Sequence, residues 1–167
     1  MSFKTYPAYV FSQAQHPGIV AAHNHLALTN PAGSGKLIFL GGVFISQVTA
    51  GAVALVEPIR GWLATNVAGG TIEATSAIAK VKSTLPDPVG VIRTDAVEIT
   101  ATLGAAWFNS PALTSTGAAS GTFVHQVPAA LPGGGPITLR PGESTVIRTE
   151  SGDTDQRFNL SIAWLET

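Results

Sequence analysis

Short runs in which apolar and polar residues alternate recur along this chain, and this period of two predicts β-strands. The clearest run is 157–165 near the C-terminal end of the sequence. One face of this predicted strand carries Phe158, Leu160, Ile162 and Trp164, and the other carries Asn159, Ser161 and Ala163. A second alternating run, 97–103, predicts a half-buried strand whose Glu and Thr residues face water.

The run Leu37–Val48 is nearly all apolar, which is typical of a central strand that is covered on both faces. Gly41 and Gly42 interrupt this run and predict a β-bulge or a bend. Further strands are predicted at 19–29, 52–60, 122–127, 137–139 and 144–149. The segment 71–83 fits both an alternating strand and a helical stripe, and we expect a strand or an extended loop because no capping residue opens it.

Eighteen glycines and eleven prolines separate these runs, and we expect eight to ten strands and no helix longer than two turns. The predicted fold is therefore all-β: an antiparallel β-sandwich, jelly-roll-like, made of two packed sheets. Residues 1–18 are predicted to form an extended N-terminal arm because Pro7 and Pro17 interrupt regular structure. Residues 19–167 form the predicted sandwich domain.

Aromatic residues of the arm and of one later segment are candidates for a subunit interface. The arm either packs on its own domain or lies on a neighbouring molecule, because exposed aromatic side chains need a partner surface. Trp107 and Phe108 precede a loop that contains proline, and we expect them in the core or at an interface, whereas Trp164 belongs to the core by its alternation. The candidate interface residues are Tyr6, Tyr9, Phe11, Trp107 and Phe108.

Charged residues make up only 11% of the sequence, well below the roughly 25% of an average globular protein. Part of the surface is therefore expected to be covered by other copies of the chain or by another protein, although Ser, Thr, Asn and Gln could also solvate it. The net charge of -1 and the absence of a basic run argue against nucleic-acid binding. The lack of cysteine excludes disulfides and thiolate metal sites.

No run approaches the roughly 20 apolar residues of a membrane-spanning helix, and no export signal is recognised. We therefore expect no membrane partner and synthesis in a cytoplasm. The segment Gly33–Lys36 resembles part of a phosphate-binding loop, but Leu37 stands where that motif needs Ser or Thr, and no helix follows. This segment is predicted to be a turn, because Pro31 fixes φ and the glycines allow positive φ.

His23 and His25 are predicted to lie on one face of a strand, about 7 Å apart, which is a spacing that could chelate a metal ion. A tetrahedral site needs two further ligands, and His16 and His125 are the only other histidines. We therefore favour hydrogen-bonding histidines and predict no metal site. The carboxylates of Glu150, Asp153 and Asp155 lack the spacing of a calcium loop and predict a solvated hairpin tip.

No nucleophile elbow is present, and the few acidic residues, among them Glu57, Glu73, Glu98 and Glu166, fit solvent-facing positions of strands. We therefore predict no catalytic residues, no cofactor and no enzymatic activity.

Three stretches resemble the small β-rich virion proteins of tailed phages, including capsid decoration (cement) proteins. The first is 25–36 followed by the apolar strand, the second runs from 69 through 88 to 94, and the third runs from 137–143 to its end at 159–166; together they cover about half of the chain. The resemblance implies a non-enzymatic virion protein that forms a homotrimer. We expect it on the capsid surface, where it binds the major capsid protein between capsomers and stabilises the head. The alternative is a glycan-binding β-sandwich module of the tail or surface, with Trp107 or the 150–155 loop at its pocket.

Overall fold

The computed structural model describes residues 8–16, 22–49, 59–109, 122–125, 137–150 and 157–167. These residues form ten strands and one short 3₁₀ helix, η1 (Thr75–Ala77). The strands are β1 (Tyr9–His16), β2 (His23–Thr29), β3 (Ile38–Thr49), β4 (Ile59–Ile72), β5 (Ala79–Lys80), β6 (Val91–Asn109), β7 (Thr122–His125), β8 (Thr138–Leu139), β9 (Ser144–Thr149) and β10 (Arg157–Glu166).

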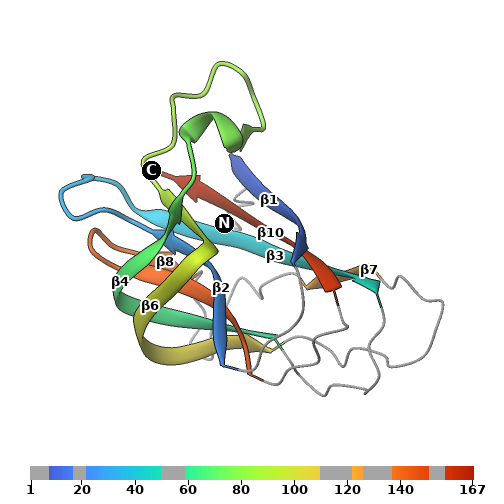
Figure 1. The fold of residues 1–167 in the computed structure, drawn as a ribbon. Helices are drawn as coiled ribbons and strands as arrows, with labels where there is room; N and C mark the ends of the chain where they lie inside the picture. The colour runs from blue at the N-terminus through green and yellow to red at the C-terminus, as the bar shows by residue number, and fades with distance from the viewer. Residues whose placement is uncertain (1–7, 17–21, 50–58, 110–121, 126–136, 151–156) are drawn as a thin grey trace, which may run out of the picture.

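The strands form two antiparallel sheets that pack against each other (Figure 1). The first sheet has the order β5-β1-β10-β3-β7, with β8 paired to the beginning of β3. The second sheet contains β2, β6, β4 and β9, and it closes on itself because β2 pairs with both β6 and β9. The prediction of an all-β antiparallel sandwich is confirmed, and the described part of the chain contains no helix longer than two turns.

The strand pairs are nested along the chain. β4 pairs with β6, β3 with β7, β2 with β9, and β1 with β10, so that each pair encloses the one before it. The four pairs alternate between the two sheets. As a result, the first and last strands lie side by side in the middle of the first sheet, and residues that are far apart in sequence meet across the sandwich.

The core lies between the inner faces of the two sheets. The inner residues of β10 are predicted correctly, because Phe158, Leu160, Ile162 and Trp164 are all fully buried. From the second sheet, Leu26, Leu28, Ile92 and Ile147 pack into the same core. Alternation along β10 therefore decides which of its side chains leave water, and the burial of apolar side chains between the sheets is the main source of stability.

The first strand corrects the prediction of an extended arm. Residues 9–16 form β1, in which Tyr9 pairs with Trp164 and Phe11 with Ile162. A strand thus occupies the part of the sequence between the two prolines. The hydroxyl of Tyr9 donates a hydrogen bond to the carbonyl oxygen of Pro86, and burial, with the nearby charge of Glu166, raises the pKa of this phenol. Tyr6 lies outside the described residues.

Strand β3 corrects a second prediction, because the described residues of the chain cover only one of its faces. Val43 and Ile45 are buried, whereas Phe44 and Val48 on the opposite face are 36% and 38% exposed. The predicted bulge is confirmed: the register with β10 shifts at Gly41, so that Gly42 and Leu40 face consecutive residues of β10. The segment 71–83 ends β4 and then continues as an extended loop with η1 and the two-residue strand β5.

The turn after β2 is organised by one buried amide. The side-chain nitrogen of Asn30 donates to the carbonyl oxygens of Lys36 (2.8 Å) and Leu139 (2.9 Å), and its side-chain oxygen accepts from Ser34 (2.6 Å). Gly33 and Gly35 adopt φ of 82° and 65°, which favour glycine. The predicted turn is therefore confirmed, and Asn30 joins it to the loop that carries β8.

Replacement of Asn30 by alanine tests this role. We expect Asn30→Ala to lower the free energy of unfolding by roughly 2–4 kcal/mol, because it leaves buried carbonyl groups without their donor. Chemical denaturation monitored by tryptophan fluorescence measures the change. The matched control is Asn66→Gly at an exposed position with φ of 52°, where we expect a change within about 0.5 kcal/mol. Equal effects of the two variants would contradict the role of Asn30.

Candidate functional site

Three residues with metal-ligating side chains meet where β2 and β6 separate. The pairing of these strands runs from Thr29 opposite Val91 to Leu26 opposite Thr94 and then ends. His25 and Asp95 are the next residues on the two strands. A shift in register between β2 and β9 also falls at His25, and such a bulge redirects a side chain. His23 lies two residues further along β2.

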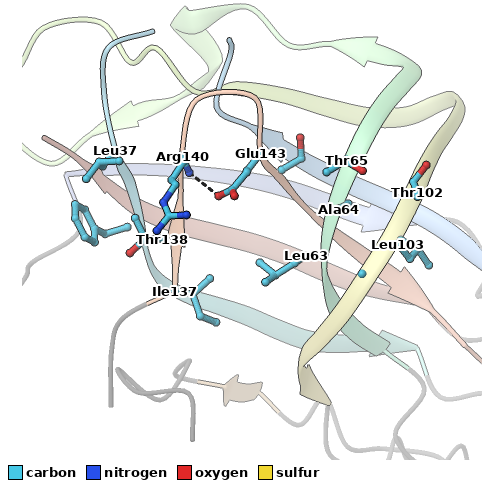
Figure 2. A pocket seen from close by; sticks show the side chains of 13 residues that line it. Leu37, Leu63, Ala64, Thr65, Thr102, Leu103, Ile137, Thr138, Arg140 and Glu143 are labelled. Atoms are coloured by element: carbon cyan, nitrogen blue, oxygen red, sulfur yellow. Dashed lines mark hydrogen bonds between the residues drawn. The ribbon is translucent and has the colours of Figure 1, made fainter. Parts of the chain in front are cut away.

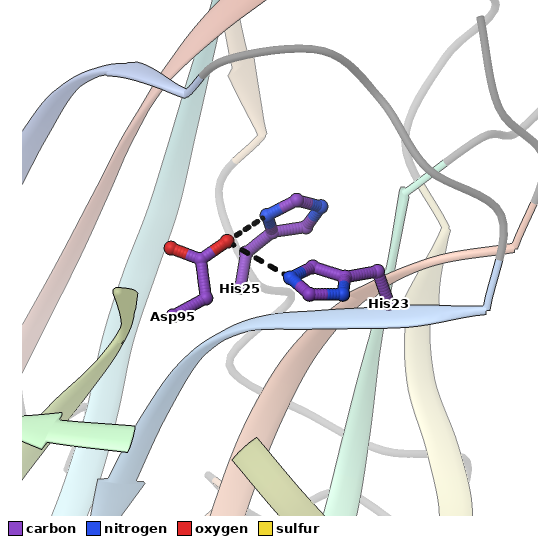
Figure 3. A group of neighbouring side chains, drawn as sticks. All are labelled: His23, His25 and Asp95. Atoms are coloured by element: carbon purple, nitrogen blue, oxygen red, sulfur yellow. Dashed lines mark hydrogen bonds and ion pairs between the residues drawn. The ribbon is translucent and has the colours of Figure 1, made fainter. Parts of the chain in front are cut away.

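One oxygen of Asp95 contacts both imidazoles, as Figure 3 shows. Oδ2 lies 2.7 Å from Nδ1 of His25 and 3.1 Å from Nε2 of His23. The ligand atoms of the three residues all lie within 4.8 Å of one another. The His25 side chain is 2% exposed and stacks edge-on against Phe158 of the opposite sheet, whereas that of His23 is 29% exposed. The cluster therefore reaches from the inter-sheet core to the solvent.

The sequence predicted the histidine pair and missed its third member. Asp95 comes from another strand, and it is brought to His25 by the pairing of β2 with β6. The side chains of His16 and His125, which the sequence offered as further ligands, lie outside the described part of the structure. The residues next to Asp95 in the sequence do not indicate that it belongs to this cluster. The two histidines that it contacts lie about 70 positions earlier in the sequence.

The outward-facing side of the first sheet is called here the outer face, and its described residues include no charged side chain between the ends of β10. The residues of the outer face are Val10 and Ser12 of β1, Asn159, Ser161, Ala163 and Leu165 of β10, and Phe39, Phe44, Ser46 and Val48 of β3. Arg157 and Glu166 bound this stretch of β10. The hydroxyl of Ser161 donates to that of Ser12 across the strands (2.8 Å), which leaves the surface flat and weakly polar.

A cavity of about 680 Å³ lies beside the beginning of β3, as Figure 2 shows. Its walls are mainly apolar, and Thr65, Thr102, Arg140 and Glu143 line its polar part. Leu37, Phe39, Leu63, Leu103 and Ile137 supply the large apolar side chains. Phe39 belongs to both the cavity and the outer face, so the two features are continuous.

The predicted interface residues that the structure describes are core residues of the same chain. Tyr9, Phe11, Trp107 and Phe108 are 3–7% exposed. The indole nitrogen of Trp107 donates to Thr145 (2.8 Å), and a Cβ at Gly61 would overlap the Phe108 ring. Their strands turn these aromatic rings inward, so the structure gives no support for an interface at these four residues.

Most of the described acidic residues hold structural hydrogen bonds. The two carboxylate oxygens of Glu166 accept from the backbone nitrogens of Gly90 (2.9 Å) and Val89 (2.9 Å). Glu73 accepts from the hydroxyl of Thr94, and Glu150 accepts from the indole nitrogen of Trp62 (2.7 Å). The prediction that Glu73 and Glu166 merely face solvent is corrected, while Asp153, Asp155 and Glu57 lie outside the described residues.

Comparisons with known proteins provide no relative from which a role could be transferred. No protein-family model matches the chain, and neither a curated protein nor a solved structure shows significant similarity to it. Within the described residues, the structure has no helix with the length and apolar character needed to cross a membrane. The site chemistry must therefore be argued from the geometry alone.

The corrected position of Trp107 can be tested by unfolding experiments. We expect Trp107→Ala to destabilise the chain by roughly 3–5 kcal/mol, because it opens a cavity in the core. The loss should be the same at low and at high protein concentration, since the residue packs within its own chain. Val81→Ala, at a position that is 59% exposed, serves as the control with little change. A loss that grows with protein concentration would place Trp107 at an interface instead.

Proposed function

We propose that this chain is a non-enzymatic structural protein of a tailed-phage virion. In this proposal it is a capsid decoration protein that associates as a homotrimer, binds the major capsid protein between capsomers at the capsid surface, and stabilises the head. The observation that carries the proposal is the outer face, an uncharged sheet surface on which Phe44 and Val48 remain more than one-third exposed. A surface of this kind favours a protein partner over water.

The sequence of β3 supports the same conclusion. Its nearly continuous apolar run is typical of a strand covered on both faces, yet those residues of the chain that the structure describes cover only the inner face. A second copy of the chain is the occupant that we propose for the other face. Sparse charge over the whole chain supports this choice, because a chain with 11% charged residues has few means to solvate a broad sheet.

The strand order adds support at the level of fold. Four nested antiparallel pairs divided between two sheets are similar to the strand pairing of the jelly roll, which occurs in viral capsid domains and also in lectins and cupins. Fold alone does not determine function, so this is support by analogy. A closed trimer also requires that the outer face of one copy meets a different patch of the next, since face-to-face packing of identical surfaces gives a dimer.

The alternative of a glycan-binding module has weaker support. It relied on an exposed Trp107 or on the 150–155 loop, but Trp107 is buried, and residues 151–156 lie outside the described residues. Trp62 and Trp164 donate their indole hydrogens to Glu150 and Glu166 and do not line the cavity. Trp107 and Trp164 are too deeply buried to stack on a sugar, whereas Trp62 is partly exposed.

A charge placed on the outer face tests the proposed association. Light scattering after size exclusion should find a trimer for the native chain. We expect Phe44→Glu to weaken its association at least about tenfold, because burying a carboxylate in an apolar contact is costly. Val97→Glu is the matched control, since Val97 is 59% exposed on β6 in the other sheet. A native chain that stays monomeric at high concentration, or equal effects of both variants, would contradict the proposal.

The number of copies in the virion tests the location. Purified virions of the encoding phage should contain the chain in hundreds of copies, as a protein bound at many capsomer junctions must be. Quantitative mass spectrometry against the major capsid protein gives this number. A dozen copies or fewer would assign the chain to the tail or the portal vertex instead.

A further inference from the structure

We propose that His23, His25 and Asp95 bind a divalent transition-metal ion, for which Zn²⁺ is the best-suited probe. This site is independent of the outer face, because its ligands point into the inter-sheet space and toward the end of the sandwich. Two imidazole nitrogens and one carboxylate oxygen are a ligand set used by zinc and other first-row transition metals, with the remaining positions open to water.

One tautomer of His25 suits a cation between the ligands. The hydroxyl of Thr149 lies 3.3 Å from the carbonyl oxygen of His23, to which it can donate its hydrogen. In the tautomer with the imidazole hydrogen on Nε2, this hydroxyl accepts from Nε2 of His25 (3.2 Å). Nδ1 of His25 then directs its lone pair at Oδ2 of Asp95, only 2.7 Å away. Two acceptors at this distance repel each other unless a second proton or a metal ion lies between them.

The same contact to Thr149 is the support that a metal-bound histidine needs. Metal-ligating histidines usually donate their second ring hydrogen to a neighbouring oxygen, which fixes the orientation of the ring. Because Thr149 is fully buried on β9, it holds His25 in the orientation that directs Nδ1 toward Asp95. Thr149 is a positioning residue in this proposal, not a ligand.

The ligand spacing also fits a metal ion after a small movement. Ligand atoms of a tetrahedral zinc site lie about 3.3 Å apart when each is about 2.0 Å from the metal. The two contacts of Asp95 Oδ2 measure 2.7 and 3.1 Å, so that they need to lengthen by about 0.6 and 0.2 Å to reach this spacing. His23 is the partly exposed member of the set and has room for the larger adjustment.

Gln13 supplies an independent indication of a ligand at this place. Its side-chain nitrogen lies 3.5 Å from the other carboxylate oxygen of Asp95, and its buried Oε1 has no hydrogen-bond partner among the described residues. A buried amide oxygen without a donor is uncommon in folded proteins. A metal-bound water is the kind of donor that would satisfy it. The metal would thus connect β2 and β6 where their pairing ends, beside β1.

Titration of the metal-depleted chain with Zn²⁺ tests the proposal. After treatment with a chelator, calorimetry should show one Zn²⁺ bound per chain, and thermal unfolding should shift to higher temperature because the ion binds only the folded state. Mg²⁺ and Ca²⁺, which prefer sites built from oxygen ligands, should give neither effect. Absence of both the binding heat and the thermal shift with Zn²⁺ would overturn the proposal.

Substitutions locate the ion. We expect His23→Ala and Asp95→Asn each to abolish the Zn²⁺-induced shift, and Thr149→Val to weaken binding roughly 10- to 100-fold while leaving the ligands in place. Asp87→Asn is the matched carboxylate control, because Asp87 forms a surface ion pair with Lys80 away from the cluster, and it should bind as the native chain does. Circular dichroism without metal confirms that each variant folds. Binding that survives both ligand substitutions would assign the ion to another site.

Discussion

The packing of two inner sheet faces against each other is the constraint on which the rest of the structure depends. β10 lies in the middle of the first sheet, and its inner residues are inaccessible to water. Its neighbours in the sheet are β1 and β3, which both lie within the first third of the sequence. Correct pairing of the last strand therefore holds the first strand in place, and the two sheets gain their shared core only when the nested pairs have formed.

This constraint also produces the outer face. Because side chains alternate across a strand, a sheet that buries one face must present the other, and its composition is then free to serve a second purpose. The acidic groups are used elsewhere: Glu73, Glu143, Glu150 and Glu166 accept hydrogen bonds in loops and at strand ends. The outer face is thus uncharged for two reasons: the chain has few charged residues, and these acidic side chains lie in loops and at strand ends.

Local pattern in the sequence was sufficient for much of the fold. The prediction for 144–149 coincides with β9, and the two faces of β10 were assigned correctly, since alternation within one strand is a local property. The arm was predicted wrongly because proline and aromatic residues gave no information on the distant strand that pairs with them. β1 is ordered by β10, and that contact spans almost the whole chain.

The candidate metal site was predictable to the same limited extent. Spacing along β2 placed His23 and His25 on one side, but alternation cannot identify a ligand on another strand. Whether Asp95 or some other residue faces the histidines depends on the register of β6 and on the bulge at His25. A shift of one residue in either strand would turn Asp95 away from the imidazoles.

The nested topology explains why two such different features occur on one small domain. The outer face uses the solvent-directed residues of the first sheet, whereas the histidine cluster uses inward-directed residues near the end of the second. Gln13 shows the separation within a single strand: it faces Asp95, while its neighbour Ser12 lies on the outer face. Substitutions on one side of β1 therefore need not disturb the other side. An ion that connects β2 to β6 would stiffen the sandwich behind the outer face without changing the residues of that face.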